Sequence, residues 1–428
     1  MADRFLSTDG LIDALADASF DRPPALVSNA HITGLGVAHA LDAHDVPVIA
    51  LDRAGGPVDD GSDGPPTVPH DGVAPSSSAV DLAGAVTYPL DDLDGFRDDV
   101  EAIVDAAGTE AVAFGCMDEW ALAYAEAEPD GVRLPFSGLD VLDSVLNKSN
   151  LYAACERLGV PYPETYRLDE DGVDPEAAAE ALGFPLVVKP ALKREFEEAF
   201  GTNVIEVDDA EAFADVVAEA ERADIEVMAQ RRVDVVAGED RSLASYVPPS
   251  GVEDALGVVG NATRYPRRFG TSCLVETDTA PEIEARALGV LEDAGYHGIS
   301  EAEFVYDEAR EEFLLLDVNT RPWKWISLPV AAGANLPMAA YAAVTDAEYE
   351  STGTEPARWV YLRDYLSLLA GDDAFRDVLS ENDWRQLVSG SFEADDELTT
   401  GVYRPSDPGP TAALIDTEFD DREYYCSC

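Results

Sequence analysis

Residues 298–307 read GISEAEFVYD and residues 313–323 read FLLLDVNTRPW, with a short acidic turn between them. Apolar residues dominate both stretches, which predicts two adjacent strands of a hairpin. Glu303 lies on the first strand, while Asp317 and Asn319 lie two residues apart on the second and therefore on one face of it. The hairpin can bring these three side chains together, so it predicts a candidate site as well as a fold element.

The oxygen atoms of Glu303, Asp317 and Asn319 suit a magnesium ion, which prefers carboxylate and phosphate oxygens and keeps some of its waters. Arg321, two residues further along, can reach an anion held by that metal. The alternative is that all of these are solvent-facing residues of an amphipathic hairpin, as single carboxylates of so acidic a chain usually are. The alternation of Asn and Arg with an acid, beside the apolar run 313–316, favours the site because solubility does not require it.

Lysine is scarce in this chain and marks a second candidate site. Only four of the 28 basic residues are lysine, namely Lys148, Lys189, Lys193 and Lys324. Lys189 ends the apolar run LGFPLVVKP (182–190), where an ammonium is costly without an anionic partner such as a nucleotide phosphate. The alternative for Lys189 is a side chain that extends its ammonium into water at a strand end. Lys148 opens a predicted helix at 147–158, and a helix start favours anions.

The first 145 residues alternate between strand and helix patterns. Strands are expected at 25–30, 47–52, 85–88 and 111–114, with helices between them, which predicts a Rossmann-like α/β domain. Gly34 and Gly36 follow the first strand and could cradle a phosphate, or could simply form a strand-to-helix turn. The Gly- and Pro-rich residues 53–80 are expected to form a surface loop.

Composition excludes several classes of partner. The formal net charge is −58, with acids spread along the whole chain, so nucleic acid and anionic membranes are not expected as partners. No apolar run reaches about 18 residues, and no secretory signal is visible, so a cytoplasmic protein is expected. The acidity favours a high-salt cytoplasm, in which screening lets like charges coexist. Five cysteines without paired spacing, including Cys426 and Cys428, predict neither a zinc site nor a disulfide framework.

These segments, in this order, resemble the ATP-grasp superfamily and in particular its carboxylate–amine ligase branch, which includes D-aspartate ligases. The resemblance runs from about residue 147 to residue 344, and its motifs are specific in order and spacing rather than singly. It rests on Lys148, on LGVPYPET (158–165), on PLVVKP (185–190), on VMAQ (227–230), on RYP (264–266), on Glu303-Phe304 and on DVNTRPW (317–323).

The resemblance implies an α/β fold with three parts. These are a Rossmann-like pre-ATP-grasp domain (1–145), an ATP-grasp domain of two α+β subdomains (146–345, hinge near 226–234) and a helical C-terminal cap and tail (346–428). It also implies roles for single residues. Lys148 and Lys189 would bind ATP phosphates, Gln230 with the backbone near Arg232 and Val233 would meet the adenine, and Glu239 would hold the ribose. Glu303, Asp317 and Asn319 would bind Mg²⁺, with Mn²⁺ as the alternative ion, and Arg321, Arg264 and Arg267 or Arg268 would stabilise the transferred phosphoryl group.

The resemblance further implies a ligase that activates a small carboxylate as an acyl phosphate and passes it to an amine, or to a thiol. Two alternatives stay open, namely another ATP-grasp phosphotransferase or carboxylase, and a non-catalytic ATP-binding regulatory protein. The second is motivated by residues 191–203, where the family's glycine-rich lid is replaced by a charged segment containing Lys193 and Arg194. Selectivity for the substrate is expected at Asp118, Glu119 and residues 264–273, and a homodimer is left open.

Overall fold

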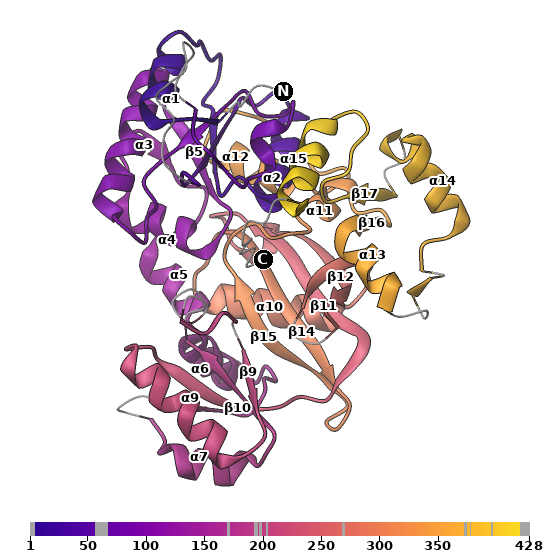
Figure 1. Ribbon diagram of the computed structural model, residues 1–428. Helices are drawn as coiled ribbons and strands as arrows, with labels where there is room; N and C mark the ends of the chain where they lie inside the picture. The colour runs from indigo at the N-terminus through magenta and orange to yellow at the C-terminus, as the bar shows by residue number, and fades with distance from the viewer. Residues whose placement is uncertain are drawn as a thin grey trace.

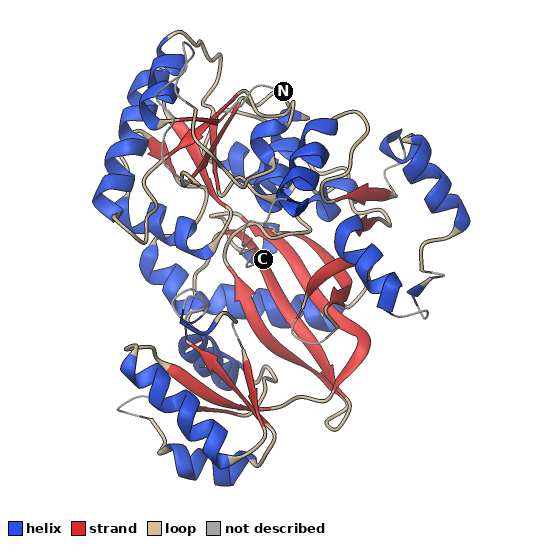
Figure 2. Cartoon of the chain, viewed as in Figure 1, coloured by secondary structure: helices blue, strands red, loops and turns tan. Residues whose placement is uncertain are grey.

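The computed structural model describes residues 5–55, 67–168, 172–191, 196, 199–202, 204–267, 270–371, 375–376, 378–394 and 397–419. Its described strands form three sheets of six, four and seven strands (Figures 1 and 2). Within these described ranges, no helix combines the length and the apolar character needed to cross a membrane. Lys193, Arg194, Arg268, Cys426 and Cys428 lie outside the described residues.

The first sheet is parallel and has the order β1-β4-β3-β2-β5-β6. Its central strands are buried and apolar except for Ser28 and Asp52 at their carboxyl ends, as expected of a parallel sheet that helices cover on both faces. The strands are β1 (Phe5–Leu6), β2 (Ala25–Ser28), β3 (Val48–Asp52), β4 (Leu82–Ala85), β5 (Ala111–Gly115) and β6 (Val132–Arg133). The helices are α1 (Thr8–Ala16), α2 (Ile32–Asp42), α3 (Leu93–Ala107), α4 (Asp118–Ala127) and α5 (Leu139–Leu146).

The second sheet is antiparallel, with the order β7-β10-β8-β9, and two helices pack on it. The apolar side chains of α9 (Ala210–Arg222) form a stripe in which Phe213 and Val217 contact the strands. The other elements are α6 (Lys148–Leu158), β7 (Thr165–Arg167), α7 (Pro175–Leu182), β8 (Leu186–Pro190), β9 (Ile205–Val207) and β10 (Val227–Arg231). In Figure 1 this unit lies below the rest of the molecule.

The third sheet has seven strands in the order β15-β14-β11-β12-β13-β16-β17 and forms the centre of the molecule (Figure 2). One face packs against α10 (Pro281–Asp293), and the other packs against Trp325 and the helices next to the first sheet. The strands are β11 (Val235–Val247), β12 (Leu256–Tyr265), β13 (Thr271–Asp278), β14 (Gly298–Asp307) and β15 (Glu312–Asn319). The short helices α11 (Ser327–Ala331) and α12 (Leu336–Ala343) follow β15.

The segment after residue 345 is not purely helical, although the sequence predicted helices there. It contains α13 (Leu362–Gly371), α14 (Glu381–Ser389) and α15 (Pro408–Phe419), but also β16 (Arg358–Val360) and β17 (Leu398–Thr400). These two strands extend the seven-stranded sheet, β16 antiparallel to β13 and β17 parallel to β16. Three-residue strands carry too little periodicity for a pattern to reveal them.

Helix α2 connects the first sheet to the C-terminal segment. A Cβ atom at Gly36 would lie 2.6 Å from the Ile326 side chain, so the glycine permits close packing of α2 against the chain beyond β15. His39, on the same helix, lies 2.9 Å from Asp407, which also accepts a hydrogen bond from Ser78 N at 3.1 Å. The Ser77 hydroxyl donates to Asp407 as well. We call these contacts the Asp407 bridge.

Candidate active site

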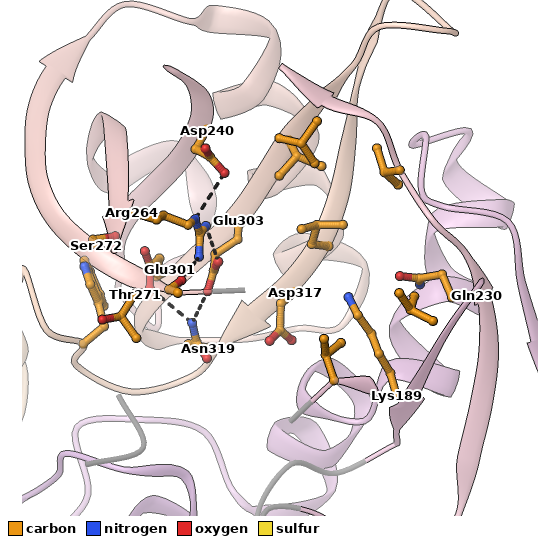
Figure 3. Close-up of a pocket in the computed structure, with 18 of the residues that line it drawn as sticks. Lys189, Gln230, Asp240, Arg264, Thr271, Ser272, Glu301, Glu303, Asp317 and Asn319 are labelled. Atoms are coloured by element: carbon orange, nitrogen blue, oxygen red, sulfur yellow. Dashed lines mark hydrogen bonds and ion pairs between the residues drawn. The ribbon is translucent and has the colours of Figure 1, made fainter. Parts of the chain in front are cut away.

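A cavity of about 630 Å³ lies between the four-stranded and seven-stranded sheets. Side chains from β8, β9 and β10 line one wall, and side chains from β11, β12, β14 and β15 line the opposite wall (Figure 3). Thr33 and Met117, which follow β2 and β5 of the first sheet, close one end. Most residues predicted from the sequence line this one cavity, namely Lys148, Lys189, Gln230, Arg232, Val233, Arg264, Arg267, Glu303, Asp317, Asn319 and Arg321.

The predicted oxygen ligands lie on one face of the β14–β15 hairpin. Glu303 pairs directly with Asp317, and Glu301 pairs with Asn319. The Asn319 amide nitrogen donates to Glu301 and to Glu303, each at 3.1 Å. The register shifts immediately after Glu303, which is a β-bulge. The extra residue is Leu316 on β15, which lines the cavity beside Asp317, whereas Phe304 and Leu315 lie in the apolar core.

Arg264 and Lys148 contact these carboxylates. The Arg264 guanidinium donates to Glu303 at 2.9 Å and to Asp240 at 3.2 Å. Burial opposes the charge on Arg264, but Glu303 and Asp240 outweigh it and raise the pKa of the guanidinium. The Lys148 ammonium donates to Asp317 at 3.1 Å, and both side chains are almost buried, with exposed fractions of 6% and 10%. Helix α6 begins at Lys148, because Asn147 caps it by accepting from Ser149 N and Asn150 N.

Glu301 belongs to this cluster but was not predicted. Burial raises the pKa of Glu301 to about 8, and Glu303 adds to the rise, whereas Arg264, Arg321 and the Asn319 amide lower it. The signal in the sequence was its position, two residues before Glu303 and hence on the same face of the strand. Asp240 was also missed, because its approach depends on the pairing of β11 with β12 and β14.

The other wall of the cavity carries Lys189 and the strand that leads to the predicted hinge. Lys189, on β8, pairs with Met228 of β10, and its side chain points toward Asp317 across the cavity (Figure 3). The Gln230 amide nitrogen donates to Tyr152 at 3.2 Å and to Thr165 at 2.9 Å, so its orientation is fixed. Arg232 contacts Asp234 at 2.6 Å and Glu206 at 3.4 Å.

Glu239 is not brought into the cavity, although the resemblance implied a ribose contact there. Its carboxylate lies 3.0 Å from Arg241, and its side chain is 41% exposed. The acids that line the cavity near the hinge are Glu206, Asp234 and Glu308 instead. The sequence could not separate these candidates, because which strand residues face the cavity depends on the irregular pairing between Val235 and Asp240.

The opposite end of the cavity is formed by residues from three parts of the chain. Arg321 donates to Asp118, at the start of α4, at 2.7 Å, which joins the first sheet to the hairpin. Arg267 lies over the Phe375 ring, at 4.8 Å from its centroid. Glu119 is buried and accepts from Tyr88 at 3.2 Å rather than lining the cavity. Lys324, Trp323 and Trp325 complete the wall.

No model of a known protein family matches the chain. Curated relatives match it over less than half of its length. D-alanine–D-alanine ligase of Chromohalobacter salexigens is 31% identical over 203 residues, 44% of this chain and 60% of that protein. D-alanine–D-alanine ligase of Ectopseudomonas mendocina is 28% identical over 198 residues, which are also 44% of this chain and 60% of that protein. The chain therefore spans about 60% of the length of the relatives it matches.

Solved structures are similar over more of the chain. N5-carboxyaminoimidazole synthetase from Staphylococcus aureus complexed with ADP has a TM-score of 0.59 and 13% identity, and the match covers 84% of this chain and 87% of that one. Biotin carboxylase from Campylobacter jejuni has a TM-score of 0.59 and 14% identity, and the match covers 81% of this chain and 75% of that one. L-amino acid ligase from Bacillus licheniformis has a TM-score of 0.54 and 15% identity, and the match covers 79% of this chain and 80% of that one. The chain is therefore similar to D-alanine–D-alanine ligases over part of its sequence, and it shares its fold with these solved structures.

Proposed function

We propose that this protein is an ATP-dependent carboxylate–amine ligase that works through an acyl phosphate. The observation that carries the proposal is that Glu303, Asp317 and Asn319 line one cavity between two sheets together with basic side chains, among them Lys148, Lys189, Arg264 and Arg321. The similarity to D-alanine–D-alanine ligases supports the type of reaction. The narrower likeness to D-aspartate ligases, and the identity of the acid and the amine, stay predictions.

The nucleotide would lie between the sheets, which we propose are the two subdomains of the ATP-grasp fold. The adenine would contact Gln230, Arg232 and Val233 at the hinge, and the triphosphate would extend toward Lys189 and Lys148. Both ammonium groups lie on the path from the hinge to the oxygen cluster, as Lys189 points to Asp317 and Lys148 contacts it. Apolar side chains that line the hinge end, among them Val187 and Val204, suit a planar base.

The oxygen cluster fits a magnesium ion by the chemistry of its donors. Because the Asn319 amide nitrogen donates to Glu301 and Glu303, its amide oxygen faces the other side of the carboxamide. Among the described residues no set of three His, Cys, Asp or Glu side chains is arranged to hold a metal. Two carboxylates and one amide oxygen nevertheless suffice for Mg²⁺, which completes its shell with water and phosphate oxygens. When bound, the ion would neutralise charge on the phosphates, and Mn²⁺ is the alternative.

The side chains would act by position and charge. A carboxylate oxygen of the acid attacks the γ-phosphorus, the bond to the bridging oxygen breaks, and ADP leaves. The amine then attacks the acyl carbon, phosphate leaves and the amine loses a proton. Arg321, which is buried, and Arg264, which is partly buried, are both held by carboxylates, so they would stabilise the charge on the migrating phosphoryl group without reorganising. Nothing in this sequence of steps needs a nucleophilic side chain.

A screen for ADP release tests the proposal. The full chain is incubated with Mg-ATP, small acids and amino acids in molar KCl, with hydroxylamine as an acceptor that traps activated acyl groups as hydroxamates. A ligase gives ADP and hydroxamate with the same acid, and Glu303→Gln abolishes both, whereas the exposed Glu381→Gln on α14 changes neither. ADP without hydroxamate would indicate a phosphotransferase, bicarbonate-dependent ADP release a carboxylase, and ATP binding without ADP a regulatory protein. Each of these three results would overturn the proposal.

A further inference from the structure

Two hydroxyl groups hold the side-chain amide of Gln230 from behind. Gln230 lies on β10, is 2% exposed and lines the cavity. Its amide nitrogen has two N–H bonds, which donate to the Tyr152 hydroxyl at 3.2 Å and to the Thr165 hydroxyl at 2.9 Å. Neither Tyr152 nor Thr165 lines the cavity. Both donors of the amide are therefore used on the side that faces away from the cavity.

The protons of these two hydroxyls decide which way the amide faces. Tyr152 donates its proton to the carbonyl oxygen of Leu316 at 2.9 Å. Thr165 donates its proton to the carbonyl oxygen of Pro163 at 2.7 Å. Burial raises the pKa of Tyr152, so its hydroxyl keeps this proton. Because each hydroxyl has one proton and uses it on a carbonyl, each can only accept from Gln230. A reversed amide would lose two hydrogen bonds whichever way the hydroxyls turned.

The amide oxygen of Gln230 consequently faces the cavity, on the side of Lys189 (Figure 3). Among the residues that the structure describes, none donates a hydrogen bond to this oxygen. A buried acceptor without a donor is costly, so the oxygen suits a ligand that offers an N–H bond. Val187, which pairs with Gln230 between β8 and β10, lines the cavity as well and suits a flat ring.

These requirements distinguish between purines. A purine with a 6-amino group offers the N–H bond that the Gln230 oxygen lacks. A 6-oxo purine, such as hypoxanthine or guanine, would place a second acceptor against that oxygen instead. The amide could accommodate a 6-oxo group only by turning its nitrogen to the cavity, which the hydroxyls of Tyr152 and Thr165 oppose.

We propose that Tyr152 and Thr165 set the base specificity of the nucleotide site, by holding Gln230 as an acceptor for the 6-amino group of adenine. The inference rests on the proposed nucleotide site and goes beyond it, because these two residues contact Gln230 and not the nucleotide. They are positioning residues. Their contribution is to fix one of the two orientations of an amide that could otherwise accept from adenine or donate to a 6-oxo purine.

The binding of three nucleotides to the full chain tests this inference. ATP is compared with purine riboside triphosphate, which lacks a group at position 6, and with ITP, whose 6-oxygen is an acceptor. Each is titrated by calorimetry in molar KCl with Mg²⁺. Relative to ATP, the Kd should be about tenfold higher for purine riboside triphosphate, which loses one hydrogen bond, and about 100-fold higher for ITP, which also sets two acceptors against each other.

A double variant separates positioning from folding. Tyr152→Phe combined with Thr165→Val removes both hydroxyls and nearly keeps the side-chain volumes. The amide can then turn its nitrogen to the cavity and donate to a 6-oxygen. The Kd of ITP should therefore fall by about tenfold and the Kd of ATP should rise by about tenfold, so that the preference disappears. A gain in affinity for ITP cannot result from a loss of folding.

Three single variants complete the design. Thr165→Ser keeps a hydroxyl and should keep the preference for ATP. Tyr162→Phe is the matched control, because it removes a hydroxyl that is not bonded to Gln230 from the ring stacked on Tyr152, at 5.0 Å between centroids, and should also keep the preference. Gln230→Met removes the acceptor and should bring the Kd values of all three nucleotides to within about threefold of one another.

The results distinguish this inference from the proposed function. If the wild type binds ITP as tightly as ATP, or if the double variant keeps the preference for ATP, the two hydroxyls do not set base specificity, and the ligase proposal stands. If the preference is found and lost as expected but no acid yields hydroxamate, this inference stands and the ligase proposal fails. If none of the three nucleotides binds, both fail.

Discussion

The contact between Lys148 and Asp317 makes a prediction that separates stability from nucleotide binding. The ammonium and the carboxylate lie 3.1 Å apart, and both side chains are nearly buried at the centre of the cavity. Lys148→Met removes the ammonium and keeps most of the side-chain volume. The Asp317 carboxylate then loses a charged partner, although it still accepts from Val318 N at 3.0 Å.

Breaking a buried pair from one side typically costs about 3–5 kcal/mol. We expect the lower end, about 3 kcal/mol, because water in the cavity can reach the carboxylate. Combining Lys148→Met with Asp317→Asn removes both charges, so the double variant should return to within about 1 kcal/mol of the wild type. The free energy of unfolding is measured by urea denaturation in KCl, followed by tryptophan fluorescence.

The gain in stability on adding ATP then tests whether Lys148 and Asp317 take part in nucleotide binding. At a Mg-ATP concentration of about 100 times Kd, the wild type should gain about 2.7 kcal/mol of stability by linkage. Both variants should gain almost none, although the double variant is folded and stable. The reasoning is refuted if Lys148→Met is as stable as the wild type, or if the double variant keeps the gain from ATP.

Three other predictions concern the metal, the hairpin and the C-terminal segment. Chelation by EDTA should abolish ADP release, and Mg²⁺ or Mn²⁺ should restore it, while circular dichroism stays unchanged; activity that survives chelation would exclude the ion. Glu303→Gln should lower kcat for ADP release by about 100-fold or more with little change in thermal stability, because it removes charge where phosphoryl transfer needs it; a variant that loses only stability would indicate a structural role. Hydrogen bonds from Arg358 lower the pKa of Asp383 from its usual 3.8 to about 2, so its ionised form stabilises the fold above pH 4 and this contribution is lost as the pH falls toward 2. Asp383→Asn should therefore cost about 2 kcal/mol at pH 7 and almost nothing at pH 2, measured by urea denaturation across that range; a difference that does not depend on pH would contradict the assignment.

The elements with strong periodicity were the predictable part of the fold. The strands that carry Glu303 and Asp317, the helix that begins at Lys148, and the alternation of the first domain all follow from local patterns. Strand β13 was not predicted, and the segment that contains β16 and β17 was predicted to be helical. The partners of β16 and β17 lie far away in sequence, so no local pattern reveals these two strands. Burial between sheets, rather than local propensity, makes these segments strands.

The candidate site also has a part that the sequence could predict and a part that it could not. Residues on the hairpin could be placed on one face from their spacing, and the rarity of lysine pointed to Lys148 and Lys189. The partners of those residues could not be predicted, since the contacts of Arg321 with Asp118 and of Lys324 with Asp364 join segments separated by 203 and 40 positions. Glu239 was predicted from its position in the sequence to contact the ribose, but in the structure its carboxylate contacts Arg241.

The Asp407 bridge bears on how the protein is made. Ser77 leaves the ribosome 330 residues before Asp407, which at about 5–20 residues per second is a delay on the order of tens of seconds. During that time α2 has no carboxylate for His39, and the central sheet lacks β17 at its edge. The amino-terminal sheet can therefore form early, but its surface for residues 398–407 stays uncovered until those residues have been made. A ribosome-bound chain stalled before residue 398 should accordingly expose that surface to chaperones and proteases, whereas the released chain does not.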